Sequence, residues 1–407
     1  MDITERFLKY VSFDTQSDEQ SHSCPSTEKQ LVLGEYLKNE LLRCGAADVS
    51  MDENGYVYGT VPASEGSENM PAVAFLAHMD TSGECSGKDV KARIIRGYDG
   101  GDIVLNEELG IITDVKNFPN IKNFAGQDII VTDGTTLLGA DDKAGIAVIM
   151  SAVEAWTADK ELKHPEIRVI FTPDEETGRG VDRINMDKVN AACGYTIDGA
   201  DAGEISYECF NASSAAIDIH GVSVHPGESF GIMKNASLLA MEFNAMLPPM
   251  EVPAATVSRM GFYHLTDMKG DVENAQLRYI LRDHSAEGLL KRKALILSAC
   301  DYMNKKYGDG TFSAQITDGY RNMIEKILPH HAYVIEDARE AIKECGLTPN
   351  EDPVRGGTDG AALSYMGLPC PNLGAGGQYF HGVHELLSIQ GMKKAVDIIM
   401  AIARKMA

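Results

Sequence analysis

The sequence contains no long hydrophobic run, because no stretch reaches the roughly 18 consecutive apolar residues of a membrane span. Its first residues are charged from the second position on and include no apolar segment of signal-peptide length. Cysteine pairs are lacking as well, since the 8 cysteines are scattered and none forms a C-x-x-C motif. This usage is typical of thiols in a reducing compartment and not of a disulfide framework. We therefore expect a cytoplasmic protein without a membrane partner.

Positive charge is scarce: 37 Lys and Arg residues against 60 Asp and Glu residues give a net charge of −23. Such a surface repels phosphates, which argues against nucleic acids and anionic membranes as partners. The Gly-rich segment 355–360 lacks the G-x-x-x-x-G-K-[ST] spacing of a phosphate-binding loop, so we expect no nucleotide site there. The acidity suits a cationic ligand, such as a metal ion or the free ammonium group of a peptide. Most of these charges need only keep the protein soluble.

Alternating strands and helices dominate both ends of the chain. With 407 residues the chain is long enough for more than one hydrophobic core, so two domains are expected. The predicted strands are 56–61, 72–77, 128–132, 167–171 and 194–197, and the predicted helices are 3–11, 29–44, 142–157, 331–344 and 389–405. This alternation indicates an α/β fold with a mostly parallel sheet and helices on both faces.

The middle of the chain has a different pattern. Its predicted strands are 215–220, 276–281 and 311–317, and its predicted helices are 235–247 and 285–305. We interpret it as a β-α-β-β-α-β order, typical of a small ferredoxin-like α+β sandwich that leaves one face of its sheet exposed. The prediction is therefore a main domain built from residues 1–208 and 323–407, with residues 209–322 inserted as a second domain.

Acidic and histidine side chains stand at the ends of several predicted strands. The centre of this pattern is Asp141, in a loop between a strand and a helix, where α/β proteins carry their chemistry. Its candidate partners follow strands or lie in Gly-rich loops, and they are His78, Asp80, Glu175, Glu176, Asp198 and His381. A hydrolytic site with a pair of zinc ions needs imidazoles and carboxylates of this kind, and one carboxylate can bridge both ions.

Two short motifs suggest specific chemistry. In the H-x-D motif, Asp80 could accept the second ring N–H of His78 and fix the tautomer of that ring. Of the adjacent residues Glu175 and Glu176, one could bind a metal while the other acts as a general base. Other readings stay open, because an H-x-D pair also occurs as a surface ion pair and the Asp141-Asp142 pair could serve only to cap a helix.

Longer motifs resemble those of the co-catalytic zinc exopeptidases, the family that includes carboxypeptidase G, the aminoacylases and succinyl-diaminopimelate desuccinylase. These motifs are 77–81 (AHMDT), 135–145 (TTLLGADDKAG) and 171–176 (FTPDEE). Within the family the chain is most similar to the tripeptide aminopeptidases, the peptidase T group. Further matched segments extend over nearly the whole chain: 6–8, 14–17, 225–227, 261–265, 355–360, 381–382 and 384–385.

The resemblance implies a role for each candidate site residue. The implied metal ligands are His78 and Asp198 for the first zinc ion, Glu176 and His381 for the second, and Asp141 as the bridge. Glu175 is implied to be the general base, and Asp80 is implied to orient the histidine of the first site. His381 is preferred over His384 because family ligands precede a glutamate by four residues, as His381 precedes Glu385.

Substrate contacts are implied for His225 and Arg282 in the insertion and for Arg355 in the Gly-rich loop of the main domain. A guanidinium group can bind the carboxylate of a peptide with two hydrogen bonds. Either arginine could instead pair with a neighbouring acid, Asp283 or Asp352. His225 has a simpler reading too, because a His-Pro-Gly sequence forms turns.

The resemblance thus implies a zinc metallopeptidase of peptide catabolism that removes the N-terminal residue of tripeptides. The alternatives are a related two-zinc dipeptidase, carboxypeptidase or N-acyl-amino-acid deacylase, because the same ligands serve them all. A non-catalytic peptide-binding or metal-storage protein is a different class, but it has no need of Glu175. We expect two zinc ions per subunit, with cobalt or manganese as substitutes, and a small peptide as substrate. In relatives the insertion is either a lid or a dimer interface, so a homodimer is also considered.

Overall fold

The computed structural model describes all 407 residues, which form two compact units. Unit 1 comprises Met1–Tyr207, Glu325–Asp352 and Thr358–Ala407, and unit 2 comprises Glu208–Ile324 and Pro353–Gly357. The predicted insertion, residues 209–322, lies within unit 2. The short segment that contains Arg355 also groups with unit 2, whereas the sequence interpretation assigned it to the main domain.

Unit 1 is built on a seven-stranded sheet. In spatial order its strands are β1 (Ala47–Met51), β2 (Val57–Val61), β8 (Ile167–Thr172), β3 (Val73–His78), β9 (Cys193–Gly199), β15 (Asn372–Gly374) and β10 (Ile205–Ser206). The central strands β8, β3, β9 and β15 are parallel, whereas β1, β2 and β10 join through antiparallel pairs. The predicted parallel sheet is therefore the centre of a mixed sheet. Every residue of β3 is buried, as expected for a strand that is covered on both faces.

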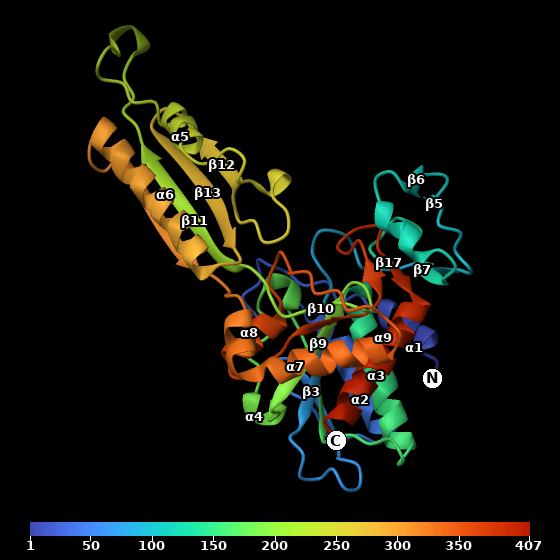
Figure 1. The fold of residues 1–407 in the computed structure, drawn as a ribbon. Helices are drawn as coiled ribbons and strands as arrows, with labels where there is room; N and C mark the ends of the chain where they lie inside the picture. Colours follow the sequence, from blue (N-terminus) through green and yellow to red (C-terminus); the bar gives the residue numbers. More distant parts are fainter. The chain divides into compact units, whose positions relative to one another are not determined.

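Helices cover both faces of this sheet, as predicted (Figure 1). The helices of this part of the chain are α1 (Ile3–Val11), α2 (Lys29–Arg43), α3 (Ala140–Ala158), α4 (Met186–Val189), α7 (Ile324–Glu344), α8 (Asp359–Tyr365) and α9 (Ile389–Lys405). On one face the ring of Phe75 stacks on Tyr195 and on Trp156 of α3. On the other face Leu76 packs in a cluster with Leu363 of α8. None of the helices combines the length and the apolar character that a bilayer crossing requires.

A second sheet of unit 1 joins segments that are far apart in the sequence. Its antiparallel strands are, in spatial order, β16 (Gly377–Gln378), β17 (Leu386–Ser388), β7 (Ile129–Val131) and β4 (Arg93–Ile95). The predicted strand at 128–132 thus exists as β7, but its backbone pairs with β17 and β4 and not with the seven-stranded sheet. Between β4 and β7 lies the excursion, residues 96–128. It contains the hairpin β5 (Ile103–Asn106) and β6 (Ile111–Thr113) and the 3-10 helix η1 (Pro119–Phe124).

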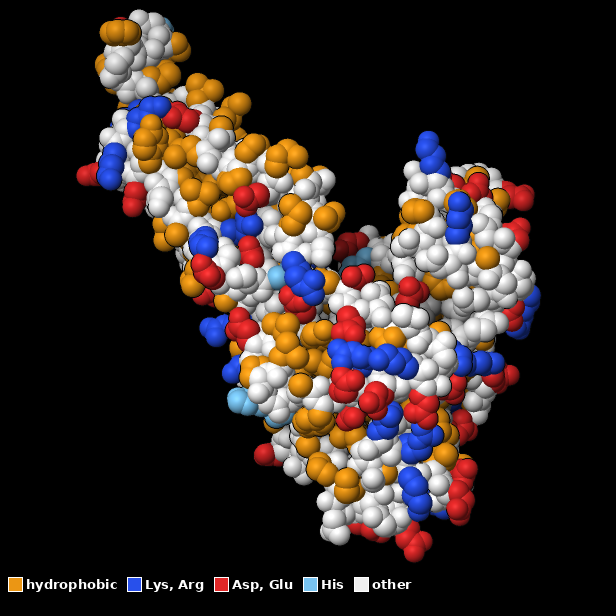
Figure 2. Space-filling model, in the orientation of Figure 1, with side chains coloured by type: hydrophobic (Ala, Val, Ile, Leu, Met, Phe, Trp, Pro, Cys, Tyr) orange, Lys and Arg blue, Asp and Glu red, His pale blue; other side chains and the backbone are white.

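Unit 2 has the predicted β-α-β-β-α-β order. Its elements are β11 (Asn211–His220), α5 (Ala236–Ala245), β12 (Phe262–Gly270), β13 (Asn274–Asp283), α6 (Ala286–Tyr307) and β14 (Phe312–Asp318), with the sheet order β12-β13-β11-β14. Ile217 and Ile219 of β11 are buried in a cluster with residues of both helices, while alternate residues of the strand are not. Some large apolar side chains of unit 2 are exposed (Figure 2), and Leu238 and Met241 of α5 are among them.

Candidate metal centre

The carboxyl ends of three neighbouring parallel strands bring most of the predicted site residues together. β3 ends at His78, whose partner in the strand register is Thr172, the last residue of β8. Glu175 and Glu176 follow β8 in the short 3-10 helix η2 (Glu175–Thr177), and Asp198 lies near the end of β9. Because parallel strands end at the same edge of a sheet, side chains from distant parts of the sequence converge there.

The first candidate ligand group consists of His78, Asp141 and Asp198. The Nε2 atom of His78 lies 2.8 Å from Asp141 Oδ1 and 3.6 Å from Asp198 Oδ1. One ligand atom from each residue lies within 4.8 Å of the others, a spacing that could hold a metal ion. The side chain of His78 is only 2% exposed, and those of the two aspartates are 12% exposed.

The second candidate ligand group consists of Asp141, Glu176 and His381. His381 Nε2 lies 3.0 Å from Glu176 Oε2 and 3.2 Å from Asp141 Oδ2. Asp141 therefore directs a different carboxylate oxygen to each group. The other oxygen of Glu176, Oε1, is buried and has no hydrogen-bond partner. Leaving such an oxygen without a partner costs free energy, so the donor set of this group suits a bound cation.

Asp80 connects the first group with the glutamate pair. Its Oδ1 atom lies 3.3 Å from His78 Nδ1, the ring nitrogen that does not face Asp141. The same carboxylate accepts hydrogen bonds from the backbone N–H of Glu175 at 3.0 Å and of Glu176 at 3.2 Å. The backbone carbonyl oxygen of Asp80 lies 3.1 Å from the same ring nitrogen, so Asp80 contacts both the histidine ring and the turn that carries the two glutamates.

Glu175 belongs to neither ligand group. Removal of its carboxyl from water raises its pKa well above the ordinary value, and the negative charge of Asp198 adds to this effect. A carboxyl whose pKa is shifted toward neutrality suits proton transfer better than an exposed glutamate does.

Burial and mutual contacts raise the pKa values of two further acids and of one histidine of the centre, so these groups keep protons to a higher pH. Burial and the charge of Asp141 raise the pKa of Glu176 to about 7 and the pKa of Asp198 to about 8. Burial alone would raise the pKa of Asp141 too, but hydrogen bonds from His381 and His78 lower it below its ordinary value. Hydrogen bonds to Asp141 and Glu176 raise the pKa of His381 to about 11. A divalent cation would replace these protons, so metal binding here should release them.

Glu385 supports the Asp141 loop in a way that sequence reasoning did not find. Its buried carboxylate accepts backbone N–H bonds from Leu138 at 2.6 Å, Gly139 at 2.8 Å and Asp141 at 3.1 Å. Burial raises the pKa of Glu385 to about 7. In the sequence analysis Glu385 served only to prefer His381 over His384 as a ligand. Its hydrogen bonds to the Asp141 loop join residues about 245 positions apart, so no local sequence pattern indicates them.

Two further buried residues support the strand ends. Asn372 Oδ1 accepts a hydrogen bond from the backbone N–H of Asp198 at 3.1 Å. Asp359 accepts one from the Thr172 hydroxyl at 2.9 Å, and burial raises its pKa to about 7. Asp359 lies in the Gly-rich segment 355–360 that the sequence analysis considered, but that segment gives no indication that Asp359 contacts the end of β8.

Two residues that the sequence left open now have clear contacts. Asp142 has non-helical φ and ψ inside α3 and accepts a hydrogen bond from Gly145 N at 3.1 Å, a bond of the kind that caps a helix. It also accepts one from His78 N at 3.3 Å. His384 lies in neither ligand group, and its Nδ1 atom lies 2.8 Å from the Thr113 hydroxyl.

The three predicted substrate residues all belong to unit 2. His225 is exposed, and its Nδ1 atom accepts a hydrogen bond from Gly227 N, as the turn reading expected. The Arg282 guanidinium donates to the carbonyl oxygens of Leu281 at 3.0 Å and of Ser213 at 3.4 Å, and it forms no salt bridge.

Arg355 is held more tightly than Arg282. It donates to the carbonyl oxygens of Ser258 at 2.6 Å and Met260 at 3.1 Å and to the Thr256 hydroxyl at 2.9 Å. Its guanidinium also lies over the ring of Phe210. Neither arginine pairs with the neighbouring acid that the sequence suggested; Asp283, for example, pairs with Arg292 at 3.0 Å.

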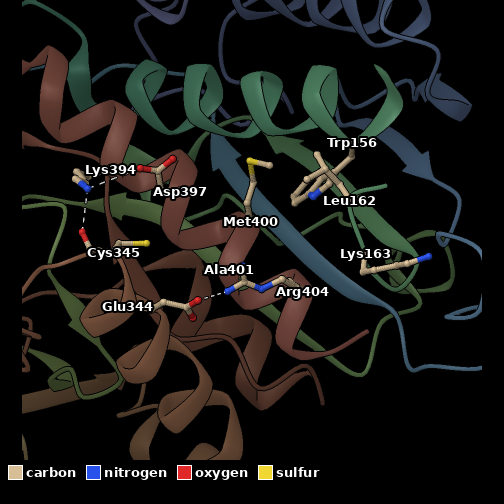
Figure 3. A pocket seen from close by; sticks show the side chains of 10 residues that line it. All are labelled: Trp156, Leu162, Lys163, Glu344, Cys345, Lys394, Asp397, Met400, Ala401 and Arg404. Atoms are coloured by element: carbon tan, nitrogen blue, oxygen red, sulfur yellow. Dashed lines mark hydrogen bonds and ion pairs between the residues drawn. The ribbon is translucent and has the colours of Figure 1, made fainter. Parts of the chain in front are cut away.

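A cavity of about 620 Å³ opens beside the second ligand group. Glu176 and His381 line it, together with the acidic residues Asp18, Glu19 and Glu84 and one cationic residue, Lys29. Another cavity, of about 390 Å³, is lined by residues of α9, of the end of α7 and of α3 with the segment that follows it, and none of the predicted site residues lines it (Figure 3).

Comparisons with known proteins identify relatives of this chain. The sequence pattern of peptidase family M20/M25/M40 matches residues 129–405. The chain is 48% identical to a peptidase T of Caldanaerobacter subterraneus subsp. tengcongensis, over 98% of this chain and 97% of that protein. A tripeptidase structure from Staphylococcus aureus subsp. aureus mu50 superposes with a TM-score of 0.78 at 21% identity, covering 99% and 97% of the two chains. A dinuclear metal binding peptidase of Bacillus subtilis superposes with a TM-score of 0.67 at 13% identity, covering 99% and 97%. At these low identities the two structures support a shared fold alone.

Proposed function

The chain belongs to peptidase family M20/M25/M40, and from that premise we propose that it is a metal-dependent aminopeptidase that releases the N-terminal residue of tripeptides. The observation that carries the proposal is the pair of ligand groups that share Asp141, with the carboxyl of Glu175 outside both. A binding or storage protein would need the ligands but would have no use for a separate base.

The centre suits a pair of zinc ions. His78 and Asp198 would hold the first ion, Glu176 and His381 the second, and Asp141 would bridge them. The set contains nitrogen and oxygen ligands without a thiolate, so cobalt or manganese would substitute for zinc. The unpartnered Glu176 Oε1 supports an ion in the second group. When bound, such a pair polarises the scissile carbonyl and lowers the pKa of water.

The residues around the ligands carry the proton chemistry in this proposal. Glu175 takes a proton from the attacking water and passes it to the leaving amine. Asp80 contacts the Nδ1 side of His78, which would leave Nε2 available to bind a metal ion. Glu385 fixes the backbone at Asp141 through its three accepted hydrogen bonds.

Recognition of the two ends of the peptide requires opposite charges. The acidic lining of the cavity beside the second group suits the free ammonium of the substrate. For the far carboxylate we retain Arg282 and Arg355, with His225 as a further contact. Arg282 is the stronger candidate because its guanidinium donates to two carbonyl oxygens, whereas that of Arg355 donates to three oxygens. Arg355 is already bound to three oxygens of unit 2, so its loss would also disturb that unit.

Related activities use the same metal ligands. A dipeptidase, a carboxypeptidase and an N-acyl-amino-acid deacylase differ from a tripeptide aminopeptidase only in how the ends of the substrate are bound. A location in the cytoplasm and a homodimer remain predictions from sequence and resemblance.

A substrate panel tests the proposed function. Metal-free protein, prepared with a chelator, should be inactive, and zinc, cobalt or manganese should restore hydrolysis. The restored enzyme should release the first residue of a free tripeptide faster than it acts on di- or tetrapeptides, and it should not act on an N-acetylated tripeptide. Full activity without metal, or equal rates on the acetylated substrate, would contradict the proposal. For the arginine role, Arg282→Ala should narrow the preference for free over C-terminally amidated tripeptides.

A further inference from the structure

His381 lies in a short loop whose backbone is unusual. The loop connects β16 and β17, and two of its residues, Tyr379 and His381, have φ values of 59° and 65°. Residues other than glycine rarely adopt this left-handed conformation, and they keep it only when surrounding contacts fix it. The side chain of His381 is 40% exposed, so packing around the ring itself does not fix the loop.

Aromatic contacts to this loop come from the excursion, residues 96–128, which lies beside β17 (Figure 1). The loop is also contacted from elsewhere, since His381 Nδ1 lies 3.2 Å from Glu84 Oε2 and the Thr132 hydroxyl lies 3.5 Å from the Val383 carbonyl oxygen. The ring of Phe118 lies 5.1 Å from the ring of Tyr379 and 4.2 Å from the ring of His384. Phe118 thus contacts Tyr379, which precedes His381 in the loop, and His384, which follows it.

Two hydrogen bonds reinforce the same pair of positions. The backbone N–H of Asn120 donates to the Tyr379 hydroxyl at 2.8 Å. The hydroxyl of Thr113, a buried residue of β6, lies 2.8 Å from Nδ1 of His384. The loop is therefore held on both sides of His381 by a segment that is more than 250 residues away in the sequence.

We propose that Phe118 and the Thr113–His384 pair are positioning residues that hold His381 at the second metal. The inference rests on the proposed function only in that His381 is taken to be a ligand. In this account His384 is not a metal ligand. Its ring instead contacts Thr113 and Phe118 of the excursion and so anchors the loop that carries His381. Loss of the contact would leave the ligand atom present but poorly oriented, and outer partners of metal ligands typically contribute about 10–100-fold to affinity.

The test is a zinc titration of metal-free protein against a competing chelator. Wild type should bind two ions, and Phe118→Ala should weaken the second ion by on the order of 10-fold or more while the first is unchanged. Phe118→Tyr keeps the ring and should bind as wild type does. A matched pair tests the hydrogen bond, since Thr113→Val should weaken the second ion and Thr113→Ser should not. Phe124→Leu is the control, because Phe124 lies in the same hydrophobic cluster without a ring contact to Tyr379 or His384.

Hydrogen–deuterium exchange of the metal-free protein gives a second readout that does not depend on a bound ion. Exchange across residues 377–386 should rise in Phe118→Ala and stay unchanged in Phe124→Leu. Wild-type zinc affinity and unchanged exchange in Phe118→Ala would overturn the inference. If wild type bound no zinc, or if His381→Ala still bound two ions, the proposed function would fail instead, and the exchange data would still decide whether Phe118 holds the loop.

Discussion

The two ligand groups share Asp141 but are supported in different ways. His78 and Asp198 of the first group come from adjacent strands of the central sheet, and His78 is 2% exposed. Glu176 and His381 of the second group come from a 3-10 turn and a loop, and His381 is 40% exposed. The sheet thus fixes the first group directly, whereas the second depends on side-chain contacts from distant segments. We expect the first ion to be held more firmly than the second.

Removal of the shared ligand should have the largest effect. Asp141→Ala takes an oxygen from each group, so both ions should be lost. Metal assistance is worth several kcal/mol of transition-state stabilisation, so turnover should fall by on the order of 10³-fold or more. Metal analysis of the purified variant checks this, with Asp133→Ala as a control from the preceding loop. Retention of two ions by Asp141→Ala would show that the groups do not share this residue.

Substitutions of the two adjacent glutamates should affect turnover and metal binding separately. Glu175→Gln should keep both ions but lose the base, which lowers turnover by a factor on the order of 10²–10⁴. Glu176→Gln should weaken the second ion and leave the first in place. Metal content and single-turnover rates of the two variants provide the measurement. Loss of metal from Glu175→Gln, with retention in Glu176→Gln, would mean that their roles are reversed.

The two histidines should differ in their effect on stability. His78→Ala should lose the first ion and destabilise the metal-free protein by about 1–3 kcal/mol, because buried acids lose their hydrogen-bond partner. His381→Ala should lose only the second ion and destabilise the metal-free protein less than His78→Ala does, because the His381 side chain is 40% exposed and water can reach its partners. Denaturant unfolding of the metal-free variants checks the comparison. Equal destabilisation by the two substitutions would show that both ligand groups contribute equally to the stability of the metal-free fold.

The last prediction is a pH dependence of the stability of the metal-free protein. Burial raises the pKa of Glu385, Asp359 and Glu176 to about 7 and that of Asp198 to about 8, above their values in an unfolded chain. The folded state then binds more protons than the unfolded state at intermediate pH. Its stability should therefore fall as the pH rises from about 5 to about 8. The raised pKa of His381 acts in the same direction.

Thermal melts at several pH values measure this dependence. Bound zinc should reduce the decline, because the cation replaces the protons that the acids would otherwise need. Asp359→Asn removes one of the titrating carboxyls and should flatten the metal-free profile slightly. A melting temperature that rises between about pH 5 and about pH 8 would contradict the assignment.

Local patterns were enough to predict much of the fold and to point to the residues that the structure brings together at the strand ends. The fold class, the family and the peptidase activity are confirmed by the family match and the 48% identical relative. The strand ends at His78 and Asp198 could be located because a buried strand and the polar residue after it are adjacent in the sequence. The roles of the individual site residues stay predictions.

Other features depend on long-range pairing and could not be read from the sequence. Strand β7 pairs with β17, more than 250 residues away, so its sheet was assigned wrongly. The predicted helix starts at residue 331, because a proline such as Pro329 normally ends or breaks a helix. In the structure α7 begins at Ile324 and continues past Pro329, with a kink at His331. The support from Glu385 and Phe118 is hidden for the same reason, since neither contact lies near its target in the chain.

Anomalous diffraction from zinc-soaked crystals tests the central claim most directly. The account predicts two peaks in unit 1, one within reach of His78, Asp141 and Asp198 and the other within reach of Asp141, Glu176 and His381. The Glu175 carboxylate should coordinate neither ion, and the second peak should lose occupancy first when a chelator is added. A single peak, or a peak coordinated by Glu175 in place of Glu176, would contradict a shared aspartate with a separate base.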